Sequence, residues 1–327
     1  MNILSRSESS VLVVSQASDA TADYLCEKMS HHGYPYLRFN TENFPTQYPL
    51  KWAIVPEEPE TFHANQMVLD TRDIRSVWFR RPGKPNISQE VSEPSAREFS
   101  RRECESALSA FWQCLDAIWV NHPDAIRIAT RKPHQLRRAK TLGFRVPDSI
   151  LSTDPEQIRE FYLKHKGRVV FKALHQDVIE IGGRNFFAYA SALAEDHLMN
   201  VSQLTYAPTI FQEYVEPRVE IRVTVVGDSV FAASIDTLNS QDQPDWRRLP
   251  PDQQPWTPFE LPSVLSKLSV QLVRAYGLAF GAIDLIQART GEYFFLELNA
   301  NGQWVWIELL TGLRISDAML ALLSGRN

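Results

Sequence analysis

FFLELNANG, residues 294–302, places an acid and an amide inside an apolar run. Glu297 and Asn299 are two residues apart, so in a β-strand both side chains leave the same face. A third polar residue, Asp284, lies in the preceding apolar run GAIDLI, residues 281–286. If the two runs pair as a hairpin, two carboxylates and one amide oxygen converge on one spot. Hard oxygen ligands of this kind hold Mg²⁺, which takes its remaining ligands from water and substrate phosphates.

Composition narrows the class of protein. The chain has 327 residues, 44% of them hydrophobic, so it can bury a large core and divide into several lobes. A net charge of -5 favours no nucleic-acid partner. The three cysteines lack metal-type spacing and an even disulfide framework, so we expect reduced core residues of a cytoplasmic protein. No secretion signal and no apolar stretch long enough to span a bilayer is present, so we expect no membrane partner.

The first section of the chain, residues 1–122, alternates strands with helices, which favours a parallel α/β domain. We expect a helix over residues 20–32 between strands at 11–14 and 36–39, and a later strand at 76–79. A long helix then carries apolar residues at helical spacing, namely Leu108, Phe111, Leu115 and Ile118. A small antiparallel hairpin is expected between residues 51 and 71.

Two further domains are expected, at residues 123–208 and 209–327. In the first, Pro133 opens a helix to Leu142 with Gly143 at its C-terminal cap, and a helix starting after Thr153 or Asp154 lies between strands at 149–151 and 169–172. A short helix is expected near residues 192–198. The last domain has a hairpin turning at 227–228, a helix over 264–276, the 281–299 hairpin and a terminal helix over 316–323, which together favour an antiparallel sheet.

A magnesium site of this type implies a polyphosphate, so cations should be available for its oxygens. Lys172 ends an apolar strand, and Lys132 stands beside a helix N-terminus, which itself attracts anions. Read alone, Lys172 also fits a side chain that reaches out to solvent. The Gly182–Gly183 pair can form a flap over phosphates. The chain has no GxxxxGK[ST] motif, which excludes a P-loop enzyme.

A second group of residues suits the nucleoside end of such a ligand. Glu213 ends an apolar strand and, with Tyr214 and Val215, begins a linker whose backbone can hydrogen-bond an adenine edge. Glu220 can accept a hydrogen bond from a ribose hydroxyl. Arg222, on the same strand face, can stabilise charge that develops in phosphoryl or acyl transfer. Taken singly, each of these residues is equally suited to a solvated strand surface.

Taken together, these residues resemble the ATP-grasp superfamily. That pattern has one lysine before the first central helix, a second on a following strand, a hinge acid, a ribose-binding acid seven residues later, and an Asp…Glu-x-Asn metal set. The chain matches it at Lys132, Lys172, Glu213, Glu220, Asp284, Glu297 and Asn299. The resemblance implies an α/β (α+β) ATP-grasp fold with an N-terminal parallel-sheet lobe, a central lobe and a C-terminal antiparallel-sheet lobe. It also implies ATP and Mg²⁺ as cofactors, with Arg222 and Lys172 in catalysis.

Shorter segments are similar to the microviridin-type ATP-grasp peptide maturases, also called graspetide synthetases. These segments are residues 38–45, 77–82, 245–247, 301–308 and 311–312. Other ATP-grasp ligases usually carry proline before the glycine that is Gly302 here, whereas this chain has Asn301. Two departures from the pattern are Pro133, where many relatives have leucine, and the sequence around Gly182–Gly183, which is not the usual flap.

The narrower resemblance implies an ADP-forming ligase that macrocyclises a ribosomally made precursor peptide with a leader and an acidic, Ser/Thr-rich core. An Asp or Glu side chain would be phosphorylated, and a Ser or Thr hydroxyl or a Lys amine would displace phosphate to form an ω-ester or ω-amide. A homodimer is also implied. Two alternatives stay open: a carboxylate–amine ligase acting on a small molecule or protein tail, and a non-catalytic ATP- or peptide-binding module.

The peptide contacts are less well defined by the sequence. Guanidinium groups bind carboxylates bidentately, so an acidic core could be held by Arg80, Arg81, Arg247 and Arg248, which also suit plain surface charge. By resemblance, residues 174–200 are where a helical leader docks. Trp304 is a candidate for lining the acceptor site, whereas Trp306 fits a buried core position.

Overall fold

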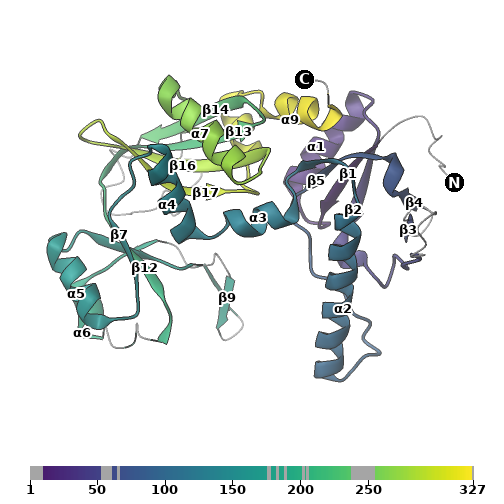
Figure 1. Cartoon of the computed structure of the whole chain (residues 1–327), viewed down its shortest axis with the longest axis horizontal. Helices are drawn as coiled ribbons and strands as arrows, with labels where there is room; N and C mark the ends of the chain where they lie inside the picture. The colour runs from purple at the N-terminus through teal and green to yellow at the C-terminus, as the bar shows by residue number, and fades with distance from the viewer. Residues whose placement is uncertain are drawn as a thin grey trace.

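The computed structural model of the chain describes residues 10–52, 61–64, 67–174, 178–181, 184–187, 190–200, 203, 206–236 and 255–325. Within these residues, three sheets of four or five strands form the framework, together with two separate strand pairs. Figure 1 shows the first sheet on one side of the molecule and the other two on the opposite side, with the helix α3 between them. The described part of the chain contains no helix with the length and apolar character needed to cross a bilayer.

The first sheet is parallel, with strand order β2-β1-β5-β6, as the alternating sequence pattern predicted. Its strands are β1 Ser10–Ser15, β2 Tyr36–Asn40, β5 Ile74–Phe79 and β6 Ile118–Val120. The accompanying helices are α1 Ala20–His31, α2 Pro94–Gln113 and α3 Pro123–Ala129, and the expected small hairpin is the antiparallel pair of β3 Thr61–Ala64 and β4 Met67–Asp70. The prediction that Leu115 and Ile118 belong to the long helix was wrong, because α2 is capped at Cys114 and Ile118 begins β6.

Both faces of the inner strand β1 are buried, which explains its continuous apolar run. Val11 and Val13 pack with α1 and with the last helix, α9 Ile315–Ser324, whereas Leu12 and Val14 pack with α2. All three cysteines are free thiols, but only Cys26 is a buried core residue as predicted, because Cys104 and Cys114 are only partly buried. The C-terminal helix thus returns to cover the N-terminal sheet, beside α1 (Figure 1).

The central sheet is antiparallel, with order β11-β8-β12-β7. Its strands are β7 Ser149–Ser152, β8 Val169–Lys172, β11 Ser191–Ala192 and β12 Thr209–Glu213; the separate pair is β9 Val178–Ile181 and β10 Arg184–Phe187. The helices are α4 Lys132–Leu142, α5 Pro155–Lys164 and α6 Glu195–Met199. Gly143 ends α4 with a left-handed backbone, as predicted, and Asp154 rather than Thr153 caps α5. The glycines at 182–183 lie outside the described residues.

The C-terminal sheet is antiparallel, with order β15-β14-β13-β16-β17. Its strands are β13 Pro217–Val226, β14 Ser229–Asp236, β15 Thr257–Pro258, β16 Phe280–Ala288 and β17 Tyr293–Asn299. The helices are α7 Ser263–Ala275, as expected, and α8 Val305–Thr311, which the sequence reading did not predict. Apolar side chains of one sheet face pack against α4 and α7, including Ile283, Phe295 and Leu298. The opposite face carries polar side chains such as Arg222 and Asp284 together with apolar ones such as Ile235 and Phe280, which belong to a different core cluster.

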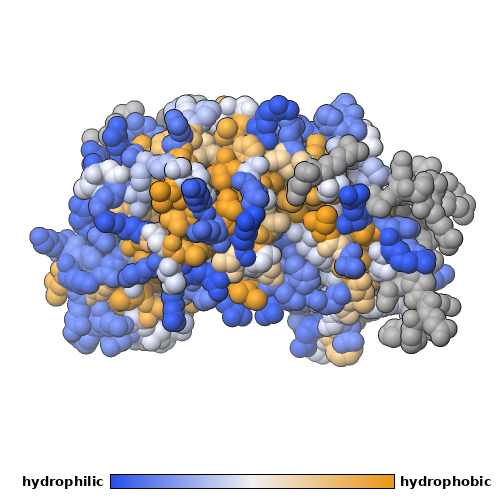
Figure 2. Space-filling view, turned by 45° about the horizontal axis from the view of Figure 1, so that its top comes forward, coloured by the Kyte–Doolittle hydropathy of each residue, from blue (hydrophilic) through white to orange (hydrophobic). Residues whose placement is uncertain are grey.

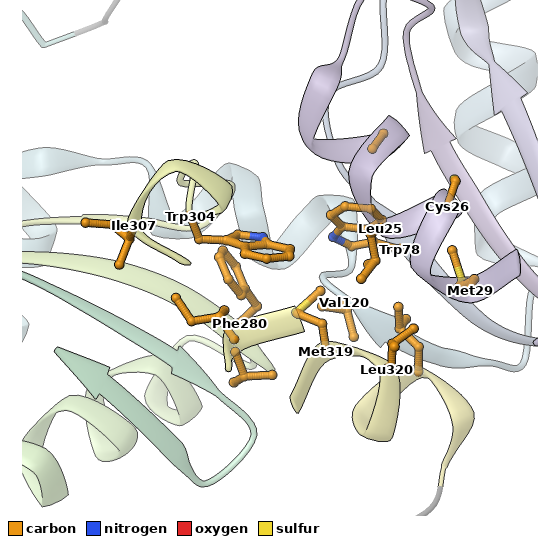
Figure 3. Close-up of a cluster of buried hydrophobic side chains, with 14 of the residues drawn as sticks. Leu25, Cys26, Met29, Trp78, Val120, Phe280, Trp304, Ile307, Met319 and Leu320 are labelled. Carbon is orange, nitrogen blue, oxygen red and sulfur yellow. The ribbon is translucent and has the colours of Figure 1, made fainter. Parts of the chain in front are cut away.

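An apolar cluster joins the N-terminal sheet to the C-terminal one. Figure 3 shows Trp304 and Phe280 on one side of this cluster and Trp78 and Leu25 on the other. Trp304 is only 1% exposed and lies edge-on to Tyr24. The prediction that Trp304 lines an open acceptor site was therefore wrong: its indole fills the core between the lobes. The surface in Figure 2 is mostly hydrophilic with scattered apolar patches, and large exposed apolar side chains belong to several elements.

A buried carboxylate also ties α1 to the C-terminal helices. Glu308 of α8 accepts hydrogen bonds from Tyr24 at 2.7 Å, from Lys28 at 3.0 Å and from the amide of Ser316 at 2.6 Å. Burial by itself would raise the pKa of Glu308, but the hydrogen bonds from Ser316, Tyr24 and Lys28 outweigh it, so the pKa lies below its ordinary value.

A lowered pKa in the folded state makes Glu308 a source of acid sensitivity. Its contribution to stability is complete above the unfolded-state pKa of about 4.3 and is lost as the pH falls through the lower folded-state value. We expect Glu308→Gln to be less stable than the parent near neutral pH, with a difference that shrinks below about pH 4. Urea unfolding at a series of pH values measures this. If the difference in unfolding free energy between the two proteins stays constant down to pH 3, the expectation is contradicted.

Candidate functional site

The structure brings the predicted oxygen ligands together. Asp284 of β16 lies directly opposite Glu297 of β17, and Ala282 lies opposite Asn299. The Asn299 Nδ2 atom donates to Asp284 Oδ2 at 3.3 Å and to Glu297 Oε1 at 3.2 Å. One carboxylate oxygen from each acid therefore reaches the same atom. The three side chains converge as the hairpin pattern predicted, but the amide nitrogen of Asn299, and not its oxygen, faces the two acids.

The local backbone explains this convergence. The pairing register shifts next to Asp284, from Asp284 opposite Glu297 to Leu285 opposite Phe295, which leaves an irregularity at Leu296. Bulges of this kind re-aim neighbouring side chains. Leu298 and Phe295 are buried against α4 and α7, so the alternating residues Glu297 and Asn299 face the other way.

The donor set suits a hard divalent cation. The two carboxylates offer oxygen atoms to a metal, and Asn299 would add its Oδ1 atom once its amide turns, because its Nδ2 atom now faces both acids. Oxygen ligands favour Mg²⁺ or Ca²⁺ over the thiolate- and imidazole-preferring metals. Across the described residues, no cluster of three or more His, Cys, Asp or Glu side chains suits a metal. The arrangement of Asp284, Glu297 and Asn299 thus fits a cation that completes its coordination with other ligands.

Arg222 provides positive charge beside the two acids. It lies opposite Asp284 on β13, and its Nη1 atom is 3.0 Å from Asp284 Oδ1. The residue is only 6% exposed, and its Nε atom has no hydrogen-bond partner among the described residues. Buried donors without partners are unfavourable, so this guanidinium is arranged to receive an anionic ligand.

The two lysines meet at one end of β8. Lys172 is the last residue of that strand, and its Nζ atom donates to Gln212 Oε1 at 2.7 Å. Lys132 is the first residue of α4, and its Nζ atom donates to the carbonyl of Ala173 at 2.8 Å. The Lys132 ammonium group therefore lies beside the end of β8, whereas the Lys172 ammonium group contacts a side chain of the neighbouring strand β12, and their role at phosphates stays a prediction.

The predicted adenine segment connects the central sheet to the C-terminal one. The Glu213 amide donates to Asp148 O at 2.8 Å, and the Tyr214 amide donates to Arg168 O at 2.8 Å. Burial raises the pKa of Tyr214. The hydrogen bonds described for this segment use no backbone atom of Val215, which leaves its amide as the candidate adenine contact. Glu220 follows on β13, on the same strand face as Arg222.

The arginines predicted to hold a peptide have different surroundings. Arg80 is 1% exposed; its Nη1 atom donates to the carbonyl of Asn301, and its Nε atom is 3.6 Å from Asp19 Oδ2. Burial lowers its pKa to about 10. The prediction that Arg80 grips an acidic peptide at the surface was wrong, because it lies inside the junction of two lobes. Arg81 is exposed, and residues 247–248 lie outside the described residues.

Sequence reasoning missed the residues that hold β17 in place. Gly302 donates its amide to Asn299 O at 3.1 Å, and a Cβ atom there would lie 2.3 Å from Ala282 Cβ. Two buried amides, Gln135 and Asn121, bond to the backbone around Asn299. A glutamine on the apolar face of a helix is the signal that could have identified Gln135, since such a position normally holds an apolar residue.

Known proteins resemble the chain along almost its whole length. The family model of the MvdD pre-ATP grasp domain matches residues 10–127, and that of the RimK-like ATP-grasp domain matches residues 130–323. A search of curated proteins finds no match.

The structure is also similar to solved peptide-modifying ligases. Against the macrocyclase MdnC of Microcystis aeruginosa MRC, solved with precursor peptide MdnA, identity is 25% and the TM-score 0.85, covering 97% of this chain and 99% of that one. Against a Chryseobacterium gregarium RiPP-associated ATP-grasp ligase with ADP and a leader and core peptide, identity is 28% and the TM-score 0.89, covering 97% of each chain. Against MdnB of Microcystis aeruginosa MRC, the values are 27% and 0.79, covering 96% and 98%.

A substitution at Gly302 tests how tightly the end of β17 packs against β16. We expect Gly302→Ala to lower the free energy of unfolding by about 1–3 kcal/mol, because its methyl group overlaps Ala282 and forces Asn299 or β16 to move. Gly83→Ala is the matched control, since its new Cβ would meet chiefly the end of the Glu42 side chain. Equal losses in the two variants, measured by urea unfolding, would contradict the assigned close packing.

Proposed function

Because the chain belongs to the RimK-like ATP-grasp family, whose model matches more than half of it, we propose that it is an ADP-forming ligase that macrocyclises a ribosomally made peptide. The observation that carries this proposal is the convergence of Asp284, Glu297 and Arg222 on one sheet face. The likeness to MdnC and to the Chryseobacterium gregarium ligase supports the choice of a peptide substrate.

The site residues then divide by role. Asp284, Glu297 and Asn299 would hold Mg²⁺, which when bound offsets the charge of the nucleotide phosphates. Lys132 and Lys172 would hold phosphate oxygens at the end of β8. The 213–215 segment would contact the adenine, and Glu220 would accept a ribose hydroxyl bond.

The reaction needs activation of a carboxylate. An oxygen of a peptide Asp or Glu side chain attacks the γ-phosphorus of ATP, the bond to the β-phosphate oxygen breaks, and ADP leaves. The product is an acyl phosphate, whose leaving group is phosphate rather than oxide. Arg222 and Lys172 stabilise the negative charge during this transfer, and the Nε donor of Arg222, which has no hydrogen-bond partner among the described residues, suits that task.

Ring closure follows from the acyl phosphate. A Ser or Thr hydroxyl or a Lys amine of the same peptide attacks the acyl carbon, inorganic phosphate leaves, and the attacking group loses its proton. The peptide loses one water for each ring. Positioning and exclusion of bulk water dominate here, because water would hydrolyse the activated carboxyl.

The peptide, its docking site and the assembly belong to the same proposal. The precursor would carry a leader and an acidic, Ser/Thr-rich core, with the leader docking on residues 174–200, whose described part includes β9, β10 and α6. The exposed Arg81 is the remaining described candidate for an acidic core contact. A cytoplasmic homodimer completes the proposal.

Intact mass measurement separates this function from its main alternative. The purified protein is incubated with ATP, Mg²⁺ and an acidic, Ser/Thr-rich precursor. A macrocyclase yields a peptide lighter by one water per ring, with one ADP formed per ring. A carboxylate–amine ligase instead yields a product that combines two molecules. An unchanged precursor mass together with ADP-coupled joining of a second molecule would contradict macrocyclisation.

Glu297 tests whether the chain is catalytic at all. We expect Glu297→Gln to reduce turnover more than about 100-fold while the protein stays folded, because a neutral amide cannot balance a bound cation. Glu292→Gln in the turn of the same hairpin is the matched control, since Glu292 is an exposed partner of Arg145. Unchanged ADP formation by Glu297→Gln would remove the metal assignment, and inactivity of the parent would favour the non-catalytic module.

A further inference from the structure

The backbone around Asn299 is bonded to side chains from three other parts of the chain. β17 is an edge strand, so the outward-facing polar groups of its backbone have no neighbouring strand to pair with. Leu298 is one of these outward positions, between Glu297 and Asn299. Its amide and carbonyl must find other partners, because buried backbone groups are rarely left unpaired.

Gln135 of α4 provides both partners for Leu298. Its Nε2 atom donates to Leu298 O at 2.8 Å, and its Oε1 atom accepts from Leu298 N at 2.9 Å. The side chain is 3% exposed, and Nε2 also donates to the carbonyl of Ala129. The single amide thus does for β17 what one residue of an added strand would do.

Asn121 holds the backbone on the other side of Asn299. It follows β6 and is 1% exposed. Its Nδ2 atom donates to Ala300 O and Phe280 O, both at 2.9 Å, and its Oδ1 atom accepts from the amides of Ala279 and Phe280 at 2.8 and 3.0 Å. Asn121 therefore joins the start of β16 to the end of β17 across the hairpin.

Arg80 completes the set. Its Nη1 atom donates to Asn301 O, and its Nε atom lies near Asp19, the N-terminal cap of α1. The three bonded positions, at Leu298, Ala300 and Asn301, enclose Asn299 from both sides. Two of the three side chains come from the N-terminal lobe, so the place of Asn299 depends on how that lobe packs against the C-terminal sheet.

We infer that Gln135, Asn121 and Arg80 are positioning residues that fix Asn299 for metal binding, an inference that rests on the proposed metal role of Asn299. The bonds that these three side chains make around Asn299 go to backbone groups, and none of them goes to the side chains of Asp284, Glu297 or Asn299. They act through the backbone, in the way that outer-shell partners orient metal ligands. The site is thereby assembled only when both lobes are in place.

The test measures metal binding rather than turnover. Mn²⁺ is titrated into the full-length protein saturated with ADP, and free Mn²⁺ is followed by electron paramagnetic resonance. Gln135→Met removes both bonds to Leu298 while keeping an unbranched side chain of similar length. We expect its Mn²⁺ dissociation constant to rise by about 10-fold or more. Arg80→Lys, which keeps the charge but loses the planar fork, should shift it in the same direction.

Ser76→Ala is the matched control for a general loss of stability. Ser76 is fully buried and donates to Leu323 O at 2.8 Å, a bond between the N-terminal sheet and α9 that does not involve β17. This variant should keep the parental Mn²⁺ affinity while its thermal midpoint falls. If Gln135→Met does not fold, the Arg80→Lys titration decides the question.

Comparison with Asn299→Ala distinguishes the positioning role from the metal role of Asn299 on which it rests. If Asn299→Ala weakens Mn²⁺ binding but Gln135→Met and Arg80→Lys bind it as the parent does, the positioning role is overturned and the metal role stands. If Asn299→Ala itself binds Mn²⁺ as tightly as the parent, the metal role of Asn299 falls, and the positioning role falls with it.

Discussion

Two carboxylates share one partly buried spot in this protein, and that arrangement constrains the rest of the molecule. Asp284 and Glu297 face each other across adjacent strands, and the amide nitrogen of Asn299 bonds to both. Like charges at this separation repel, and partial burial removes solvation from each, so the pair requires positive charge nearby. Arg222 supplies part of it at 3.0 Å. A divalent cation with its nucleotide would supply the remainder, so an ATP-dependent chemistry is consistent with this face.

The fold supplies the stiffness that this arrangement needs. On the reverse of the sheet, α4 and α7 bury Ile283, Phe295 and Leu298 in one core. At the open end of the hairpin, Gly302 leaves no room for a side chain against Ala282. The N-terminal lobe packs against Trp304, and Tyr24 and Lys28 of α1 donate hydrogen bonds to Glu308. These contacts fix the segment after β17 to α1. Packing contacts from both the N-terminal and the C-terminal sheet thus hold in place the strands that carry Asp284, Glu297 and Asn299.

Local patterns in the sequence predicted the parts of the structure that depend on neighbours in the chain. The period-two alternation predicted that Glu297 and Asn299 share a face, and the hairpin with Asp284 followed from it. Gly143 was predictable as a helix end because a left-handed backbone at that position favours glycine.

The end of α2 was not predictable from the sequence, because Leu115 and Ile118 continue the helical spacing by coincidence after the chain has left the helix. Burial was not predictable either: Arg80 and Trp304 look like surface or ligand-facing residues until the lobes are brought together. The bonds of Gln135 and Asn121 join residues more than a hundred positions apart, which no local pattern encodes.

In the proposed function, Asp284, Glu297 and Asn299 together bind the cation that accompanies the nucleotide. Crystals grown with ADP and Mn²⁺ allow the cation to be located from its anomalous scattering. We expect a Mn²⁺ peak in contact with oxygen atoms of all three side chains and of the ADP phosphates. A structure with ADP bound but with Mn²⁺ absent from these side chains, or held by other residues, would contradict it.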